Sequence, residues 1–188
     1  MGRRNDRSSS NPPRVIFMCG PAGAGKSTVA RRLERGGMVR LSYDEVAWAR
    51  GIRSMPLADE VRAEIEQGLR ARLLELVDSG RDVVLDFSFW SRRAREEYRS
   101  LLRPFGIEPE TVYLATAREV ALARVRRRRL EHGDDFTLSE EVATAYFDQF
   151  EPPTADECPL EVIGRGADDS SGPGRNSGGA SAAGRDDA

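Results

Sequence analysis

The chain has 188 residues, of which 29 are basic and 31 acidic, and its formal net charge is −2. The basic residues are 28 arginines and one lysine, Lys26. A single lysine excludes chemistry that needs two, and it excludes the Asn-Lys-x-Asp loop with which GTPases read guanine. The near-neutral charge argues against a dedicated duplex-DNA binder.

The cysteines and the hydropathy argue against a disulfide-rich, metal-binding, membrane-spanning or secreted protein. Cys19 and Cys158 form neither a disulfide framework nor a metal-binding spacing, and Cys19 closes an apolar run in which it should pack as a small buried residue. No apolar stretch approaches the ~20 residues of a membrane span, and the first apolar run is too short for a secretory signal. We therefore expect a soluble, cytoplasmic protein.

Composition divides the chain into three parts. Residues 1–13 are polar and end in two prolines, so we expect a disordered lead. Residues 164–188 contain no Leu, Ile, Val or aromatic residue and cannot bury enough apolar surface to offset the entropy of ordering them. The folded domain is predicted to be 14–163, with 164–188 as a disordered tail.

Within this domain, short apolar strands alternate with amphipathic helices. In chain order we predict a strand at 14–19, a helix at 26–35, a strand at 38–42, a helix at 57–79, a strand at 82–87, a helix at 91–103, a strand at 111–116, helices at 117–130 and 139–150, and a strand at 160–163. This alternation predicts an α/β fold in which helices cover both faces of a parallel sheet.

A glycine-rich motif lies between the first strand and the first helix. It matches G-x-x-x-x-G-K-[ST] and consists of Gly20, Pro21, Ala22, Gly23, Ala24, Gly25, Lys26, Ser27 and Thr28. Glycines let the backbone approach a ligand, and the exposed N–H groups form an anion cradle at a positive helix end. Lys26 would place a cation on the β- and γ-phosphates, and the Ser27 hydroxyl would ligate Mg²⁺. The motif predicts binding of ATP with Mg²⁺.

Features outside the loop distinguish between the classes of protein that carry such a motif. An AAA+ motor needs a second helical domain, for which about 150 ordered residues leave little room, and an ABC ATPase needs an LSGGQ-type signature, which is absent. A compact kinase needs only this sheet, an acceptor pocket and an arginine-bearing lid.

Two aspartates end strands at the edge of the sheet where the loop lies. Asp44 follows the second strand, and Asp86 ends the third. We assign Asp44 as the base that accepts the proton of an attacking hydroxyl, and Asp86 as a Mg²⁺ ligand together with Ser27. The two roles could be exchanged, and either aspartate could instead cap the helix that follows it.

An arginine-rich helix is predicted to act as a lid over the phosphates. It is followed by the polar turn 132–135, and its arginines are Arg118, Arg124, Arg126, Arg127, Arg128 and Arg129. We assign Arg124 to nucleotide binding, and Arg126 and Arg128 to stabilisation of the transferring group. The alternatives are a solvated face that pairs with nearby acids, and a nucleic-acid patch, although no aromatic residues interleave with the arginines.

Other residues at this edge could line an acceptor pocket or simply pack the loops. They are Trp48, Arg50, Arg53 and Met55 after Asp44, and Phe87, Phe89 and Trp90 after the third strand. His132, the single histidine, is expected to be exposed and without a role, so we predict neither a zinc site nor a histidine relay.

Taken together, these residues resemble a known group. The loop 20–28, Asp44, the segments 83–95 and 112–116, and FEPPTADE at 150–157 are similar to zeta-toxin and polynucleotide-kinase-like P-loop kinases, including small bacterial "AAA family ATPase" proteins. The resemblance implies a three-layer sandwich with a five-stranded parallel sheet in the order 2-3-1-4-5. It also implies ATP, Mg²⁺ and phosphoryl transfer to a hydroxyl, with Asp44 as the acceptor-side aspartate. One departure is Ala47, where the polynucleotide kinases carry an arginine.

We therefore predict an ATP-dependent kinase that phosphorylates a hydroxyl of a small molecule. The first alternative is a polynucleotide 5′-hydroxyl kinase, because acceptors in the group include nucleic-acid ends. The second is a nucleotide-binding regulatory module that acts through a protein partner, which the sequence does not name.

Overall fold

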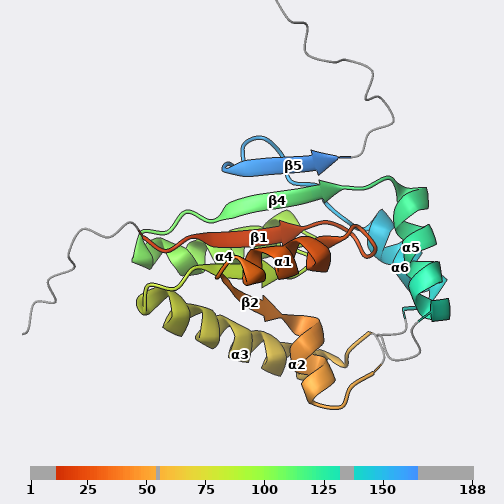
Figure 1. The fold of residues 1–188 in the computed structure, drawn as a ribbon, viewed down its shortest axis with the longest axis horizontal. Coiled ribbons are helices and arrows are strands. Elements are labelled where there is room, and N and C mark those ends of the chain that lie inside the picture. The colour runs from red at the N-terminus through yellow and green to blue at the C-terminus, as the bar shows by residue number, and fades with distance from the viewer. Residues whose placement is uncertain (1–11, 54–55, 132–137, 165–188) are drawn as a thin grey trace, which may run out of the picture.

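The computed structural model describes residues 12–53, 56–131 and 138–164 (Figure 1). Most of the expected lead and tail, Met55 and the turn that holds His132 lie outside the described residues. In chain order the elements are β1 (Val15–Cys19), α1 (Lys26–Arg35), β2 (Val39–Ser42), α2 (Tyr43–Ala49), α3 (Asp59–Asp78), β3 (Val83–Asp86), α4 (Arg92–Leu102), the 3₁₀ turn η1 (Arg103–Phe105), β4 (Glu110–Ala115), α5 (Arg118–Glu131), α6 (Glu140–Asp148) and β5 (Leu160–Gly164).

The five strands form one parallel sheet in the order β2-β3-β1-β4-β5, which confirms the predicted fold. Alternate residues of β1 point to opposite faces of the sheet. Val15, Phe17 and Cys19 belong to the core that α3 and α4 cover, whereas Ile16 and Met18 pack on the side of α1. Helices on both faces make the three-layer sandwich.

Helix α2 is absent from the predicted elements, and only the alternative in which Asp44 caps a following helix implied it. Its seven residues, YDEVAWA, bury only Ala47 completely, so they carry too little apolar periodicity to identify a helix. The Ser42 hydroxyl caps it by accepting a hydrogen bond from the Glu45 amide at 3.4 Å. As a result, Asp44 lies in the first turn of a helix.

Helices α5 and α6 lie together beyond the carboxyl ends of the strands, on the side to which the arrowheads of β1 and β4 point in Figure 1. Leu122 and Val125 of α5 pack against Ala143 of α6 in a small cluster separate from the main core. The predicted lid is therefore an arginine-bearing helical layer at the phosphate-loop end of the sheet. Within the described ranges, no helix has the length and apolar character needed to cross a membrane.

Candidate active site

The phosphate loop connects the buried strand β1 to the N-terminus of α1. Gly25 is the N-cap residue of α1, with a left-handed φ of 103°, and no side chain caps the helix. The first amides of α1 are thus directed at the space beside the loop, as an anion site requires. At the other end of the loop, the Gly20 amide donates to the carbonyl of Ser88, 3.2 Å away, in the β3–α4 loop.

Helix α5 lies directly on the loop at Gly23. A Cβ at this position would lie 2.3 Å from the carbonyl oxygen of Ala121, and φ is +79°. Only glycine fits both the contact and the backbone conformation. The Arg124 guanidinium also donates to the carbonyls of Gly23 and Ala24, each at 3.3 Å, so α5 is fixed to the loop by shape and by hydrogen bonds.

The backbone of the phosphate loop itself holds the Lys26 side chain. Its Nζ donates to the carbonyl oxygens of Gly20 at 2.8 Å and of Pro21 at 2.9 Å. Burial lowers the pKa of this ammonium from 10.5 to about 8, although the charges of Asp86 and Asp44 act in the opposite direction. The sequence analysis expected both aspartates at this edge of the sheet, and their charges lie near enough to act on Lys26.

Asp86 is almost completely buried and is bonded through both of its oxygens. The Ser27 hydroxyl donates to Oδ1 at 3.2 Å, and Nη1 of Arg40 donates to Oδ2 at 3.0 Å. Arg40 also pairs with Glu34 of α1 and Glu45 of α2, so it connects three elements around the loop. The sequence analysis missed this residue, although an arginine inside a short apolar strand was a visible signal.

The donors at this point suit a magnesium ion. Within the described residues, no group of three or more His, Cys, Asp or Glu side chains is arranged to hold a metal by itself. Ser27 and Asp86 are hard oxygen donors only 3.2 Å apart. This fits Mg²⁺, which prefers oxygen ligands and commonly completes its shell with phosphate oxygens and water.

Neither aspartate caps the helix that follows it. Helix α2 is capped by Ser42, and α4 is capped by Ser91, whose hydroxyl accepts from the Ala94 amide at 3.2 Å. Asp44 is exposed at the start of α2, as an acceptor-side base would be. The base and metal assignments of Asp44 and Asp86 remain predictions.

The arginines of α5 divide between two faces of the helix. Arg124 bonds to the loop, and the positive charge of Arg128 acts to lower the pKa of Lys26. Arg126 instead forms an ion pair with Glu140 of α6 at 3.1 Å. At about 100° per residue, Arg128 lies on the same face as Arg124, whereas Arg126 lies roughly opposite. Of the three assigned arginines, Arg124 bonds to the phosphate loop, Arg128 shares its face of the helix, and Arg126 pairs with α6.

Two of the aromatic residues expected at the acceptor edge are packed in the core. Phe87 and Phe89 are buried in the main core, and only Trp90 of the three aromatics is exposed, at 52%. Arg50 pairs with Glu64 at 3.1 Å, and the Arg53 guanidinium lies 3.6 Å from the centre of the Trp48 ring. Of the third-strand aromatics, only Trp90 is available for an acceptor.

A buried ion pair holds the β3–α4 loop in place, and sequence reasoning did not find it. Arg95 is fully buried and makes a two-pronged contact with Glu157, with distances of 2.7 and 2.8 Å. Burial alone would raise the pKa of Glu157, but its hydrogen bonds to Arg95 and to the Thr154 amide lower it to about 2. Arg99 binds the same carboxylate at 3.1 Å.

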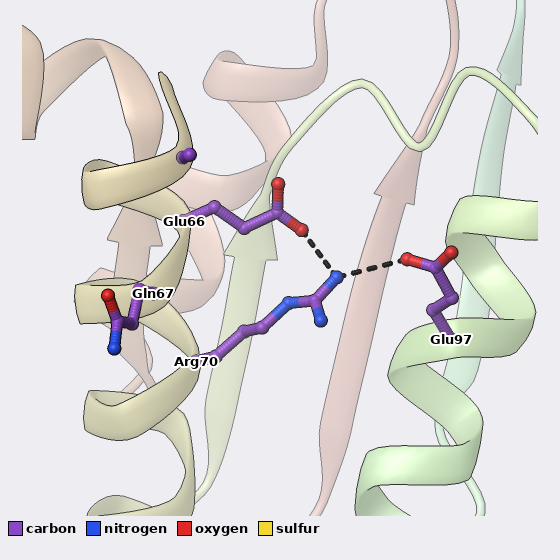
Figure 2. A pocket seen from close by; sticks show the side chains of 5 residues that line it. Glu66, Gln67, Arg70 and Glu97 are labelled. Carbon is purple, nitrogen blue, oxygen red and sulfur yellow. Dashed lines mark hydrogen bonds and ion pairs between the residues drawn. The ribbon is translucent and has the colours of Figure 1, made fainter. Parts of the chain in front are cut away.

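Away from the phosphate loop, a hollow of about 380 Å³ lies between α3 and α4 (Figure 2). Arg70 spans it from α3 and bonds to Glu66 on its own helix and to Glu97 on α4. Because the arginine is occupied by both carboxylates, we regard this cluster as a link between the two helices.

Cys19 packs at the end of β1, as expected. It is fully buried, and burial raises the pKa of its thiol to about 11. The thiol therefore stays neutral and is not a nucleophile.

A phosphate loop at the carboxyl end of a five-stranded 2-3-1-4-5 sheet, overlaid by an arginine-bearing helix, defines a P-loop kinase-like protein. The AAA domain family model matches residues 15–153, and the chain belongs to that family. A curated relative, a shikimate kinase of Halorhodospira halophila (strain DSM 244 / SL1), is 36% identical over 129 residues, which cover 65% of this chain and 70% of the relative.

Solved structures share the fold. A chain of the Pnkp1/Rnl/Hen1 RNA repair complex superposes with a TM-score of 0.66 at 18% identity, covering 76% of this chain and 45% of that one. This chain thus spans less than half the length of the repair protein. A sugar kinase from Janibacter sp. HTCC2649 superposes with a TM-score of 0.59 at 21% identity, covering 81% of this chain and 86% of that one. At these identities, the structures show the fold alone.

Proposed function

We propose that the protein transfers the γ-phosphoryl group of ATP to a hydroxyl of a small-molecule acceptor. Relatives that are kinases support phosphoryl transfer in general. The observation that carries the proposal is the set of contacts at one loop: Lys26 is held within it, Asp86 bonds to Ser27, and Arg124 of α5 bonds to its carbonyls. Asp44 and Arg128 lie near enough for their charges to act on Lys26.

Each residue then has a defined task. The loop amides and Lys26 bind the β- and γ-phosphates, and Ser27 with Asp86 would hold Mg²⁺, which supplies charge neutralisation on the phosphates. Asp44 orients the acceptor hydroxyl and takes its proton. Arg124 and Arg128 stabilise the charge that develops on the transferring group.

The small-molecule acceptor is preferred over a polynucleotide end because of Ala47. This residue is completely buried on α2, in the position where the polynucleotide kinases it resembles carry an arginine. The experiment that follows also bears on the finer assignment to the zeta-toxin and polynucleotide-kinase-like group and on the role of a protein partner.

The test is a phosphoryl-transfer screen with radiolabelled ATP against sugars, cyclitols, nucleosides, aminoglycosides and 5′-hydroxyl oligonucleotides. Labelling of a small molecule supports the proposal, labelling of the oligonucleotide alone supports the 5′-kinase, and ATP binding with no labelled acceptor supports the regulatory module.

Two variants test the assigned roles. Asp44→Asn should lower transfer by about 10²-fold or more while ADP affinity stays near that of the wild type, because the base touches only the acceptor. Lys26→Ala should weaken ADP binding as well as transfer. Near-normal transfer by Asp44→Asn would refute the base assignment.

A further inference from the structure

We infer that Trp90 determines acceptor specificity, because its exposed indole forms a stacking surface for an acceptor that carries its hydroxyl on a ring. The inference rests on the proposed function and adds the class of acceptor. It starts from a contrast: the side chains of Phe87 and Phe89 are buried, whereas that of Trp90 is 52% exposed. The exposed indole therefore offers a large flat apolar face that a ligand can cover.

The loop that carries Trp90 lies between the two halves of the candidate site. On one side, Ser88 accepts the hydrogen bond from the amide of Gly20, where the phosphate loop begins. On the other side, the ring of Phe87 packs edge-on against Tyr43, with 4.7 Å between ring centres. Tyr43 immediately precedes Asp44, so the loop lies next to both the phosphate loop and the helix of the candidate base.

The backbone around Trp90 is fixed on both sides of the residue. Before it, Phe89 has a positive φ of 41°, its ring stacks on Phe17 with 4.4 Å between ring centres, and its carbonyl accepts from the buried Arg95 at 2.9 Å. A left-handed backbone at a phenylalanine is strained and persists only where the surroundings enforce it.

After it, the Trp90 carbonyl accepts from the Glu151 amide at 2.8 Å. The Glu151 carboxylate in turn accepts from the Arg92 amide, also at 2.8 Å, in the first turn of α4. Glu151, in the segment between α6 and β5, therefore fixes the C-terminal side of the β3–α4 loop.

A fixed backbone with an exposed aromatic side chain is a preorganised binding surface. Because the backbone is already fixed, stacking a ligand on the indole has to order only its two side-chain torsions, so more of the stacking energy appears as affinity. A ring presents a face to the indole, whereas an open-chain polyol has to be ordered first. This favours cyclic hydroxyl compounds over open-chain ones.

The binding test uses the fact that the chain has two tryptophans, Trp48 and Trp90. In the Trp48→Phe protein with saturating MgADP, the emission of Trp90 is titrated with shikimate, myo-inositol and adenosine, and with the open-chain compounds D-mannitol and D-gluconate. A saturable change with one or more ring compounds, and none with the open-chain pair, supports the inference. No change with any ring compound, or an equal change with the open-chain pair, overturns it.

The kinetic test applies to the acceptor found in the transfer screen. Trp90→Ala should raise the KM for that acceptor about tenfold relative to the KM for MgATP, and Trp90→Phe should restore most of the loss because it keeps a ring. Tyr146→Ala is the matched control, since Tyr146 is an exposed aromatic on α6. An equal acceptor KM in wild type and Trp90→Ala, or an open-chain acceptor, overturns the inference. If ring compounds alter Trp90 emission while the transfer screen labels no small molecule, the proposed function is refuted and the stacking surface stands.

Discussion

Raising the pH from about 7 to about 9 should weaken the binding of MgADP about tenfold, because Lys26 loses its charge over this range. The ammonium is needed to attract the phosphates. Burial lowers the pKa of Lys26 to about 8, and the attraction of Asp86 and Asp44 does not compensate fully. At neutral pH the free protein therefore still carries the charge, but one pH unit above 8 it has largely lost it.

The size of the effect follows from proton linkage. Bound phosphates favour the ammonium, so the pKa of Lys26 in the complex is higher than in the free protein. Affinity is complete below the lower pKa of about 8 and falls as the pH rises towards the higher one. In this window binding takes up one proton, and each pH unit costs about 1.4 kcal/mol, or a factor of about ten.

Titration calorimetry with MgADP at several pH values measures the effect without turnover. Repeating each titration in two buffers with different ionisation enthalpies counts the protons taken up. Lys26→Arg is the matched control, because a guanidinium stays charged and should give an affinity that is weaker but independent of pH. A wild-type affinity that stays constant up to pH about 9.5, with no proton uptake, would refute the lowered pKa.

Three further predictions concern packing and the lid. Gly23→Ala should lower the free energy of unfolding, measured by thermal denaturation, by about 2 kcal/mol or more, because the added Cβ would clash with α5. Gly37→Ala is the control: its φ is +106° but the space around it is open, so it should lose only about 1 kcal/mol through backbone strain. Arg128→Ala should lower kcat at least about tenfold, whereas Arg126→Ala should change it less than about twofold, because the contact of Arg126 among the described residues is an exposed ion pair with Glu140. Equal losses in kcat would show that Arg126 also acts on the transferring group. Glu157→Gln should lower the free energy of unfolding by about 3 kcal/mol, because it leaves Arg95 and Arg99 without their counter-charge. The stabilisation that the Glu157 carboxylate gives the wild type should be present above pH 4.5 and be lost as the pH falls towards 2, and urea denaturation at neutral and acid pH measures both effects.

Local features of the sequence were sufficient to locate the strands, the helices and the phosphate loop along the chain. The bounds predicted for the helix at 26–35 coincide with α1, because the loop motif fixes its start and two glycines end it. The remaining predicted strands and helices lie within a few residues of the observed ones, because apolar residues form continuous runs in buried strands and recur every three to four residues in amphipathic helices. The strand order came from the family resemblance, which the phosphate loop and the strand-end aspartates carried.

Tertiary structure alone decided which side chains reach the site. Arg95 and Glu157 are 62 positions apart, and nothing in either neighbourhood indicates that they meet. Arg126 and Arg128 look alike in the sequence, but Arg128 lies on the helix face that carries the loop-bound Arg124, whereas Arg126 pairs with Glu140 of α6. The same holds for Phe89 and Trp90, because burial depends on what lies over a residue. The sequence predicts the lone lysine as the phosphate ligand, but its lowered pKa exists only because folding encloses it among backbone carbonyls, where water no longer stabilises its charge.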